Sequence, residues 1–146
     1  MSAELVTAGA QVPSQKKSKG LDISLWVAQV ALAFAFGMAG FMKVTKPIAE
    51  LGQQMGWVKF YSPQMVRFIG TVEILGALGL ILPAVTRFLP RLTALAAAGL
   101  TLVMLGAIEF HLTHNDLQHI APAIVLAALS TFVAWGRFKK APIAPR

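Results

Sequence analysis

Four long apolar runs separated by short polar segments dominate the pattern of the chain. They cover Ile23–Met42, Phe68–Thr86, Leu92–Ile108 and Ile120–Gly136. Each run is apolar on all sides instead of along one stripe, which is typical of helices surrounded by lipid. About 20 apolar residues in a helix cross the hydrocarbon core of a bilayer. The pattern therefore predicts four membrane-spanning helices, at about residues 23–43, 64–85, 91–112 and 117–136.

The segment 47–60, between the first two runs, has a different pattern. Its apolar residues recur every three or four positions and would form one stripe of a short helix. These residues are Ile48, Leu51, Met55 and Val58. The aromatic residues that follow, Trp57, Phe60 and Tyr61, are typical of a membrane–water interface. We therefore predict a short amphipathic helix that lies on the membrane surface.

The predicted fold class is all-α: an integral membrane four-helix antiparallel bundle with a short interfacial helix between spans 1 and 2. Residues 1–21 would be a polar tail, 22–138 the membrane domain and 139–146 a basic tail. Residues that favour helix starts mark the span boundaries. They are Asp22 or Ser24 for the first span, Ser62-Pro63 for the second and Asn115 or Asp116 for the fourth.

The charge balance refines this topology. The chain has 13 lysines and arginines against 6 acidic residues, and most of the basic residues flank the spans on the side of the two termini. The positive-inside rule then places both termini in the cytoplasm, and the same residues would attract anionic lipid headgroups. Nucleic acid is not an expected partner, because no element that could read it remains outside the membrane. The absence of cysteine excludes disulfides and thiolate chemistry.

Three charged residues lie within or at the edge of the apolar runs: Lys43, Glu73 and Glu109. Ionisable groups are costly at that depth, so they usually face the interior of a bundle and mark a functional site. With the termini inside, all three fall in the outer half of the membrane. We predict a Lys43–Glu73 ion pair, with Arg67 as a second partner for Glu109 or Asp116. The alternative interpretation is that these charges only clamp helices together.

All three histidines of the chain fall in one short segment, Glu109–His119. Glu109 and His111 are about 200° apart around a helix, so they cannot share a face. The spacing matches no strong metal-binding motif, and we assign no metal site. Four interpretations of this segment remain open: a proton relay, a ligand site, a His/carboxylate metal site and a solvated interfacial loop.

Two short motifs resemble the DoxX-like family of small four-helix membrane proteins. They are Gly40-Phe-Met-Lys43 and Arg67-Phe-Ile-Gly70-Thr-Val-Glu73-Ile-Leu-Gly76, and the resemblance extends over about residues 25–138. It implies a bacterial cytoplasmic (inner) membrane and an association with respiratory or sulfur-redox machinery. One branch resembles the small membrane subunit of a thiosulfate:quinone oxidoreductase. The histidine segment is not part of the family pattern.

The leading hypothesis is a membrane protein that binds a lipophilic small molecule, with a quinone as one candidate, in an outer-half cavity. Lys43, Glu73 and Glu109 would be its catalytic groups. The further candidate ligand-binding residues are Gly40, Arg67, Gly70, His111, His114, Asp116 and His119. Alternatives are a non-catalytic anchor of a larger complex and a small isomerase or hydrolase using glutamate acid–base groups. Expected partners are membrane lipids, a redox subunit and a second copy of the chain; no cofactor is assigned.

Overall fold

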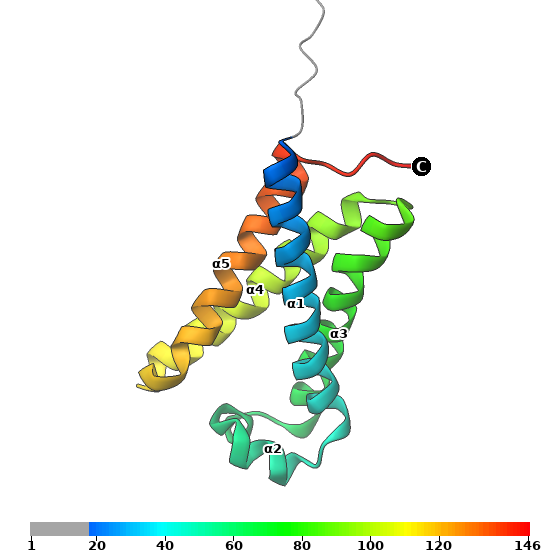
Figure 1. Cartoon of the computed structure of the whole chain (residues 1–146). Coiled ribbons are helices and arrows are strands. Elements are labelled where there is room, and N and C mark those ends of the chain that lie inside the picture. Colours follow the sequence, from blue (N-terminus) through cyan, green and yellow to red (C-terminus); the bar gives the residue numbers. More distant parts are fainter. Residues whose placement is uncertain (1–17) are drawn as a thin grey trace, which may run out of the picture.

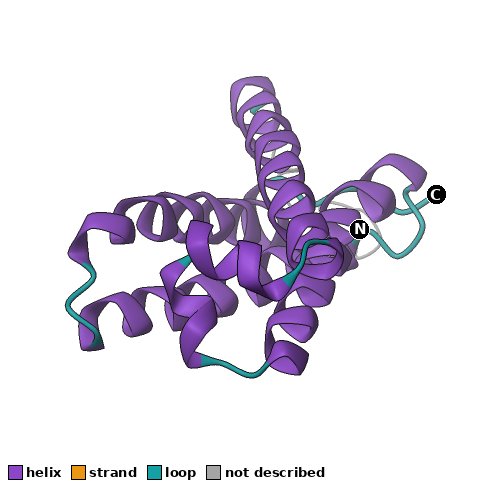
Figure 2. Cartoon of the chain, turned by 90° about the horizontal axis from the view of Figure 1, so that it is seen from below, coloured by secondary structure: helices purple, strands orange, loops and turns teal. Residues whose placement is uncertain are grey.

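The computed structural model describes residues 18–146, and within them all regular structure is helical (Figure 2). The four long helices are α1 (Lys19–Thr45), α3 (Pro63–Thr86), α4 (Arg91–Thr113) and α5 (Ile120–Trp135). A π-helical turn, η3 (Gly136–Lys140), continues α5. The prediction of an all-α bundle with four long apolar helices is confirmed. Most of the predicted N-terminal tail, residues 1–17, lies outside the described residues.

The four helices form two antiparallel pairs, α1 with α3 and α4 with α5. The pairs lie close together at the end that carries the start of α1 and the C-terminus, and they splay apart toward the other end (Figure 1). Helices α1 and α5 meet at the closed end, where Leu25 packs against Gly136. The open end is covered by the segment that joins α1 to α3 (Figure 1).

Large apolar side chains cover the outside of the bundle as well as its interior. Phe34, Val85 and Leu102 are 71%, 63% and 69% exposed, whereas Leu32 and Leu80 are fully buried. All four long segments have the length and composition to cross a membrane. Exposing so many apolar side chains to water would be unfavourable, whereas contact with lipid chains has no such cost. The chain is therefore a multi-pass membrane protein.

The segment between α1 and α3 forms two short helices instead of the single predicted one. They are α2 (Ile48–Gln54) and the 3₁₀ helix η1 (Gly56–Phe60). Met55 is extended between them and interrupts the helix. The predicted apolar stripe nevertheless faces inward. Its residues pack with Met42, Trp57 and Val66 in a small cluster of their own, in which Leu51, Val58 and Val66 are buried.

Two helix starts test the predicted caps. At α3 the prediction is confirmed, since the Ser62 hydroxyl accepts a hydrogen bond from the Met65 amide and Pro63 opens the helix. At α1 it is wrong. Ser18 caps the helix, four residues before the expected start of the membrane domain, and neither Asp22 nor Ser24 does so. The Asp22 carboxylate is engaged elsewhere, as described next.

A buried arginine ties three helices together at the closed end. The Arg137 side chain is 1% exposed, and its Nη1 donates to the Asp22 carboxylate at 2.6 Å. Its Nε donates to Gln29 Oε1 at 2.6 Å, and the Gln29 amide donates to the Leu80 carbonyl of α3 at 2.8 Å. The guanidinium also lies over the Trp26 ring. Sequence reasoning assigned Arg137 only to the basic flank of the fourth span.

Replacing Arg137 by methionine is expected to lower the free energy of unfolding by about 1.5 to 3 kcal/mol. The reason is that Gln29, which is fully buried, would lose a charge-assisted hydrogen bond. Thermal and denaturant unfolding in detergent measure the effect. Lys139→Met is the matched control, because Lys139 is an exposed neighbour on the same turn. Equal stability of the two variants would contradict the structural role of Arg137.

Candidate functional site

Two glycines allow α1 and α3 to approach closely near the open end. A Cβ atom on Gly40 would lie 2.6 Å from the Gly70 carbonyl oxygen and 3.0 Å from the Ile74 amide nitrogen. A Cβ atom on Gly70 would lie 2.9 Å from the Gly40 carbonyl oxygen. These three atoms belong to the backbone, which cannot move aside as the end of a side chain does, and a Cβ atom on Gly70 would also lie 2.7 Å from Lys43 Cβ. The close packing of the two helices therefore depends on glycine at both positions.

The predicted Lys43–Glu73 ion pair is present beside this contact. Lys43 Nζ lies 2.9 Å from Glu73 Oε1 and 2.7 Å from Oε2, so the ammonium bridges both carboxylate oxygens. The two residues are 5% and 2% exposed. Side chains on a helix lean toward its N-terminus. In an antiparallel pair, Lys43 and Glu73 therefore lean toward each other from opposite directions, and the two charges meet inside the bundle.

Arg67 does not form the predicted second ion pair with Glu109 or Asp116. Its Nη1 instead donates a hydrogen bond to the backbone carbonyl of Lys43. The last carbonyls of a helix have no partner within the helix, and Lys43 lies in the last turn of α1. Arg67 therefore provides a hydrogen-bond donor for a carbonyl group at the end of α1 and fixes the backbone at Lys43.

A cavity of about 360 Å³, the ion-pair cavity, is lined by residues of α1, η1, α3 and α4. Lys43, Glu73 and Glu109 all line it, so the structure brings the three predicted catalytic groups to one cavity. Lys43 Nζ also lies 5.7 Å from the centre of the Trp57 ring. Glu109 is exposed and makes no ion pair within residues 18–146. The other lining residues are largely apolar: Trp57, Tyr61, Ile69, Leu102, Val103, Met104, Gly106, Ala107, Phe110 and His111.

A second cavity of about 540 Å³, the histidine pocket, lies at the open end between α2–η1 and the α4–α5 connection. His111, His114, Asp116 and His119 line it together with Lys59. Trp57, Phe110 and His111 line both cavities. These three residues are therefore the shared wall between the buried ion pair and the surface of the molecule.

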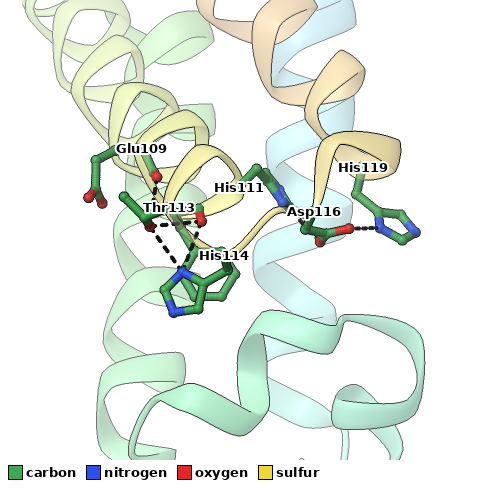
Figure 3. Close-up of polar contacts among 7 residues, drawn as sticks. Glu109, His111, Thr113, His114, Asp116 and His119 are labelled. Carbon is green, nitrogen blue, oxygen red and sulfur yellow. Dashed lines mark hydrogen bonds and ion pairs between the residues drawn. The ribbon is translucent and has the colours of Figure 1, made fainter.

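Asp116 joins two of the three histidines (Figure 3). His111 Nδ1 donates to Asp116 Oδ2 at 3.0 Å, and His119 Nδ1 donates to Asp116 Oδ1 at 2.6 Å. The hydrogen bond from His119, reinforced by that from His111, holds the pKa of the Asp116 carboxyl below its usual value. Asp116 occupies the N-cap position of η2 (Leu117–His119), one of the two predicted positions, but its side chain makes no capping hydrogen bond to η2 or α5. The carboxylate is occupied by the two imidazoles.

His114 and Glu109 stand apart from this group. The His114 ring stacks on Phe110, with ring centres 4.0 Å apart, and its Nδ1 contacts the Phe110 carbonyl and the Thr113 hydroxyl. The Glu109 carboxylate points away from His111 and Asp116, as the helical phase predicts (Figure 3). In the described part of the chain, no group of three His, Asp or Glu side chains is arranged to hold a metal ion.

Sequence reasoning missed the aromatic wall of the site. It assigned Trp57 and Tyr61 to the membrane interface, but both also line the ion-pair cavity. Phe110 lies between two residues of the predicted polar constellation, Glu109 and His111, and was not singled out. Its place one position before His111 was the available signal. Only the fold shows that Phe60, at the end of η1, and the next residue, Tyr61, pack against it.

Comparison with known proteins adds one match. Residues 27–133 match the sequence profile of the DoxX-like family. The matched range includes the glycine contact, the ion pair and the histidine segment. No curated protein and no solved structure matches the chain.

Proposed function

Because the chain belongs to the DoxX-like family, we propose that this multi-pass membrane protein binds a lipophilic carbonyl compound of the quinone class and serves membrane redox machinery. The observation that carries the proposal is the buried Lys43–Glu73 pair at the wall of a largely apolar cavity. Ligand sites are typically apolar clefts of about 300–1,000 Å³ with a few convergent polar groups. The ion-pair cavity has both the size and the composition of such a site.

Each part of the cavity has a defined task in this proposal. The Lys43 ammonium, which has three donors, donates a hydrogen bond to a carbonyl oxygen of the ligand while it stays paired with Glu73. The rings of Trp57, Tyr61 and Phe110 contact the flat quinone ring. The exposed rim at Leu102 and Glu109 is the route by which a lipophilic molecule enters from the bilayer.

The proposed setting is a bacterial cytoplasmic membrane with both termini in the cytoplasm. The closed end carries Arg87, Arg91, Arg137 and Lys139 near the C-terminus, which supports this orientation. The ion-pair cavity and the histidine pocket then lie toward the outer side. A redox subunit and a second copy of the chain are proposed partners.

The experiment that tests the proposal uses Trp57 as the reporter. In a Trp26→Phe/Trp135→Phe background, Trp57 is the only tryptophan left of three, and it lines the cavity. Decylubiquinone is expected to quench its fluorescence saturably, because a bound quinone would contact the ring. Fluorescence titration of the detergent-solubilised protein and of the protein in liposomes measures the effect.

Removing the charges of the pair is expected to weaken binding. The neutral double variant Lys43→Gln/Glu73→Gln should bind decylubiquinone about tenfold more weakly, since a charge-assisted hydrogen bond to the ligand is lost. The control is Lys46→Met, because Lys46 contacts only the half-exposed Glu50. Unchanged affinity in a folded double variant contradicts the role of the pair. No saturable quenching at all, with a protein partner retained in stoichiometric amount, would favour the non-catalytic anchor instead.

A further inference from the structure

We propose that His111, oriented by Asp116, carries a proton between a ligand hydroxyl in the ion-pair cavity and water in the histidine pocket. The inference rests on the proposed function, because it requires a protonatable ligand such as a quinol in the ion-pair cavity. It assigns a task to residues that lie outside the family motifs, and it makes the histidine pocket the aqueous side of the same site.

His111 lies at the wall between the two cavities. Its side chain is only 10% exposed, and it lines both cavities. Within residues 18–146 its ring forms hydrogen bonds through Nδ1 alone, to Asp116. A carboxylate on Nδ1 fixes the tautomer and leaves Nε2 as the acceptor. His111 therefore has one ring nitrogen, Nδ1, bonded to Asp116 and the other, Nε2, free to accept a proton.

The exposure of the three residues increases along one direction. The side chains of His111, Asp116 and His119 are 10%, 30% and 72% exposed. Figure 3 shows the two imidazoles on either side of the carboxylate, with His119 on the side away from α4. His119 donates to Oδ1 and His111 donates to Oδ2. The bond from His119 therefore fixes the orientation of the carboxylate, so that Oδ2 keeps its hydrogen bond to His111. His119 is thus a positioning residue.

The transfer is an acid–base step that needs no electron donor. A ligand hydroxyl gives its proton to His111 Nε2, and the oxygen keeps the electron pair of the broken O–H bond. The ionised Asp116 stabilises the imidazolium that forms, and His111 then releases the proton to water in the histidine pocket, which it also lines, and returns to its starting tautomer. The ligand loses one proton and water gains one. The Lys43 ammonium, on the wall of the same cavity, stabilises the anionic oxygen that remains.

Other charged or titratable side chains line the two cavities, and none replaces His111. They are Lys43, Lys59, Tyr61, Glu73, Glu109 and His114. Glu73 is held in the ion pair, and Glu109 points away from Asp116 (Figure 3). His114 is stacked on Phe110 and bonds to a backbone carbonyl instead of to the carboxylate. The proton path from the ion-pair cavity to the histidine pocket therefore runs through His111, which lines both cavities and which Asp116 orients.

The test is a pH jump on the protein loaded with a hydroxynaphthoquinone, whose visible absorbance reports its ionisation. Stopped-flow absorbance measures how fast the bound probe gains or loses its proton. Asp116→Asn and His111→Gln are expected to slow this step by roughly a hundredfold, the usual contribution of a general acid–base group. Added imidazole should restore the rate in His111→Gln, because it can occupy the histidine pocket. Gln118→Ala is the control, since Gln118 is an exposed neighbour on η2.

Decylubiquinone, which has no ionisable hydroxyl, separates the two proposals. If it still quenches Trp57 in Asp116→Asn and His111→Gln while their proton-transfer rates equal that of the unsubstituted protein, the relay is wrong and the quinone site stands. If neither decylubiquinone nor the hydroxynaphthoquinone binds the unsubstituted protein, both proposals fail. Slow transfer that imidazole rescues supports the relay, because a general loss of structure would not respond to imidazole.

Discussion

Replacement of Glu73 by alanine is expected to lower the free energy of unfolding by about 3 to 5 kcal/mol. The substitution leaves the Lys43 ammonium in the bundle interior, where it is 5% exposed, without the carboxylate that both of its short contacts use. Removing one partner of a buried ion pair strands a charge, which costs more than the pair itself contributes. Lys43→Met is expected to have a comparable effect for the same reason. Unfolding by denaturant in detergent micelles measures both.

The double variant Lys43→Met/Glu73→Leu separates stability from ligand binding. With both charges replaced by apolar groups of similar volume, most of the stability should return. Quenching of Trp57 by decylubiquinone should stay weak, because the donor to the ligand is absent. A double variant that binds as well as the unsubstituted protein would reduce Lys43 and Glu73 to a clamp between α1 and α3. Persistently low stability would instead show that the pair stabilises the fold.

Replacement of Gly40 by alanine is expected to cost about 3 kcal/mol and to weaken quinone binding as well. The new methyl group would lie 2.6 Å from the Gly70 carbonyl oxygen, so α1 and α3 must move apart at this level. Overpacking against side chains typically costs about 1 to 3 kcal/mol, and a backbone obstacle favours the upper end of that range. Separating the helices also separates Lys43 from Glu73, one turn away on each helix. Unfolding and Trp57 quenching measure the two effects.

Gly99→Ala is the matched control for this substitution. Gly99 lies in the middle of α4, and a Cβ atom there would meet nothing within 4 Å. Alanine is favoured over glycine in a helix interior by up to about 1 kcal/mol, so this variant should be as stable as the unsubstituted protein or slightly more so. If Gly40→Ala behaved like Gly99→Ala, close packing of α1 on α3 would not be what places the ion pair.

Much of the fold could be predicted from two sequence patterns, the long apolar runs and the glycine motifs. A lipid-exposed helix must be apolar on all sides and long enough to cross the bilayer, so the spans are visible without knowledge of any neighbour. The Lys43–Glu73 pair was also predictable, because two opposite charges at similar depth on consecutive spans have few alternative partners. The start of α3 at Ser62-Pro63 was predictable as well, because a capping serine and a proline act only on the turn in which they lie.

Contacts between distant segments were not predictable in this way. Arg137 could be assigned only to a basic flank, yet it bonds to Gln29 and Asp22, which are 108 and 115 positions away. Asp116 looked like a helix cap because the preference for caps is local, and the approach of two histidines overrode it. Arg67 lacked its expected acidic partners because the end of α1, carrying an unsatisfied carbonyl, lies next to it.

The sequence alone determined the all-α membrane fold, the antiparallel order of the spans and the Lys43–Glu73 pair, because the cost of charge and unpaired backbone in lipid is a local constraint. Only the tertiary structure decided that the two helix pairs splay at one end, that Trp57, Phe110 and His111 form a wall shared by two cavities, and that Asp116 joins His111 to His119. Those features depend on how each helix is rotated and tilted against its neighbours. Helices that are apolar on every side carry no periodic signal for that rotation.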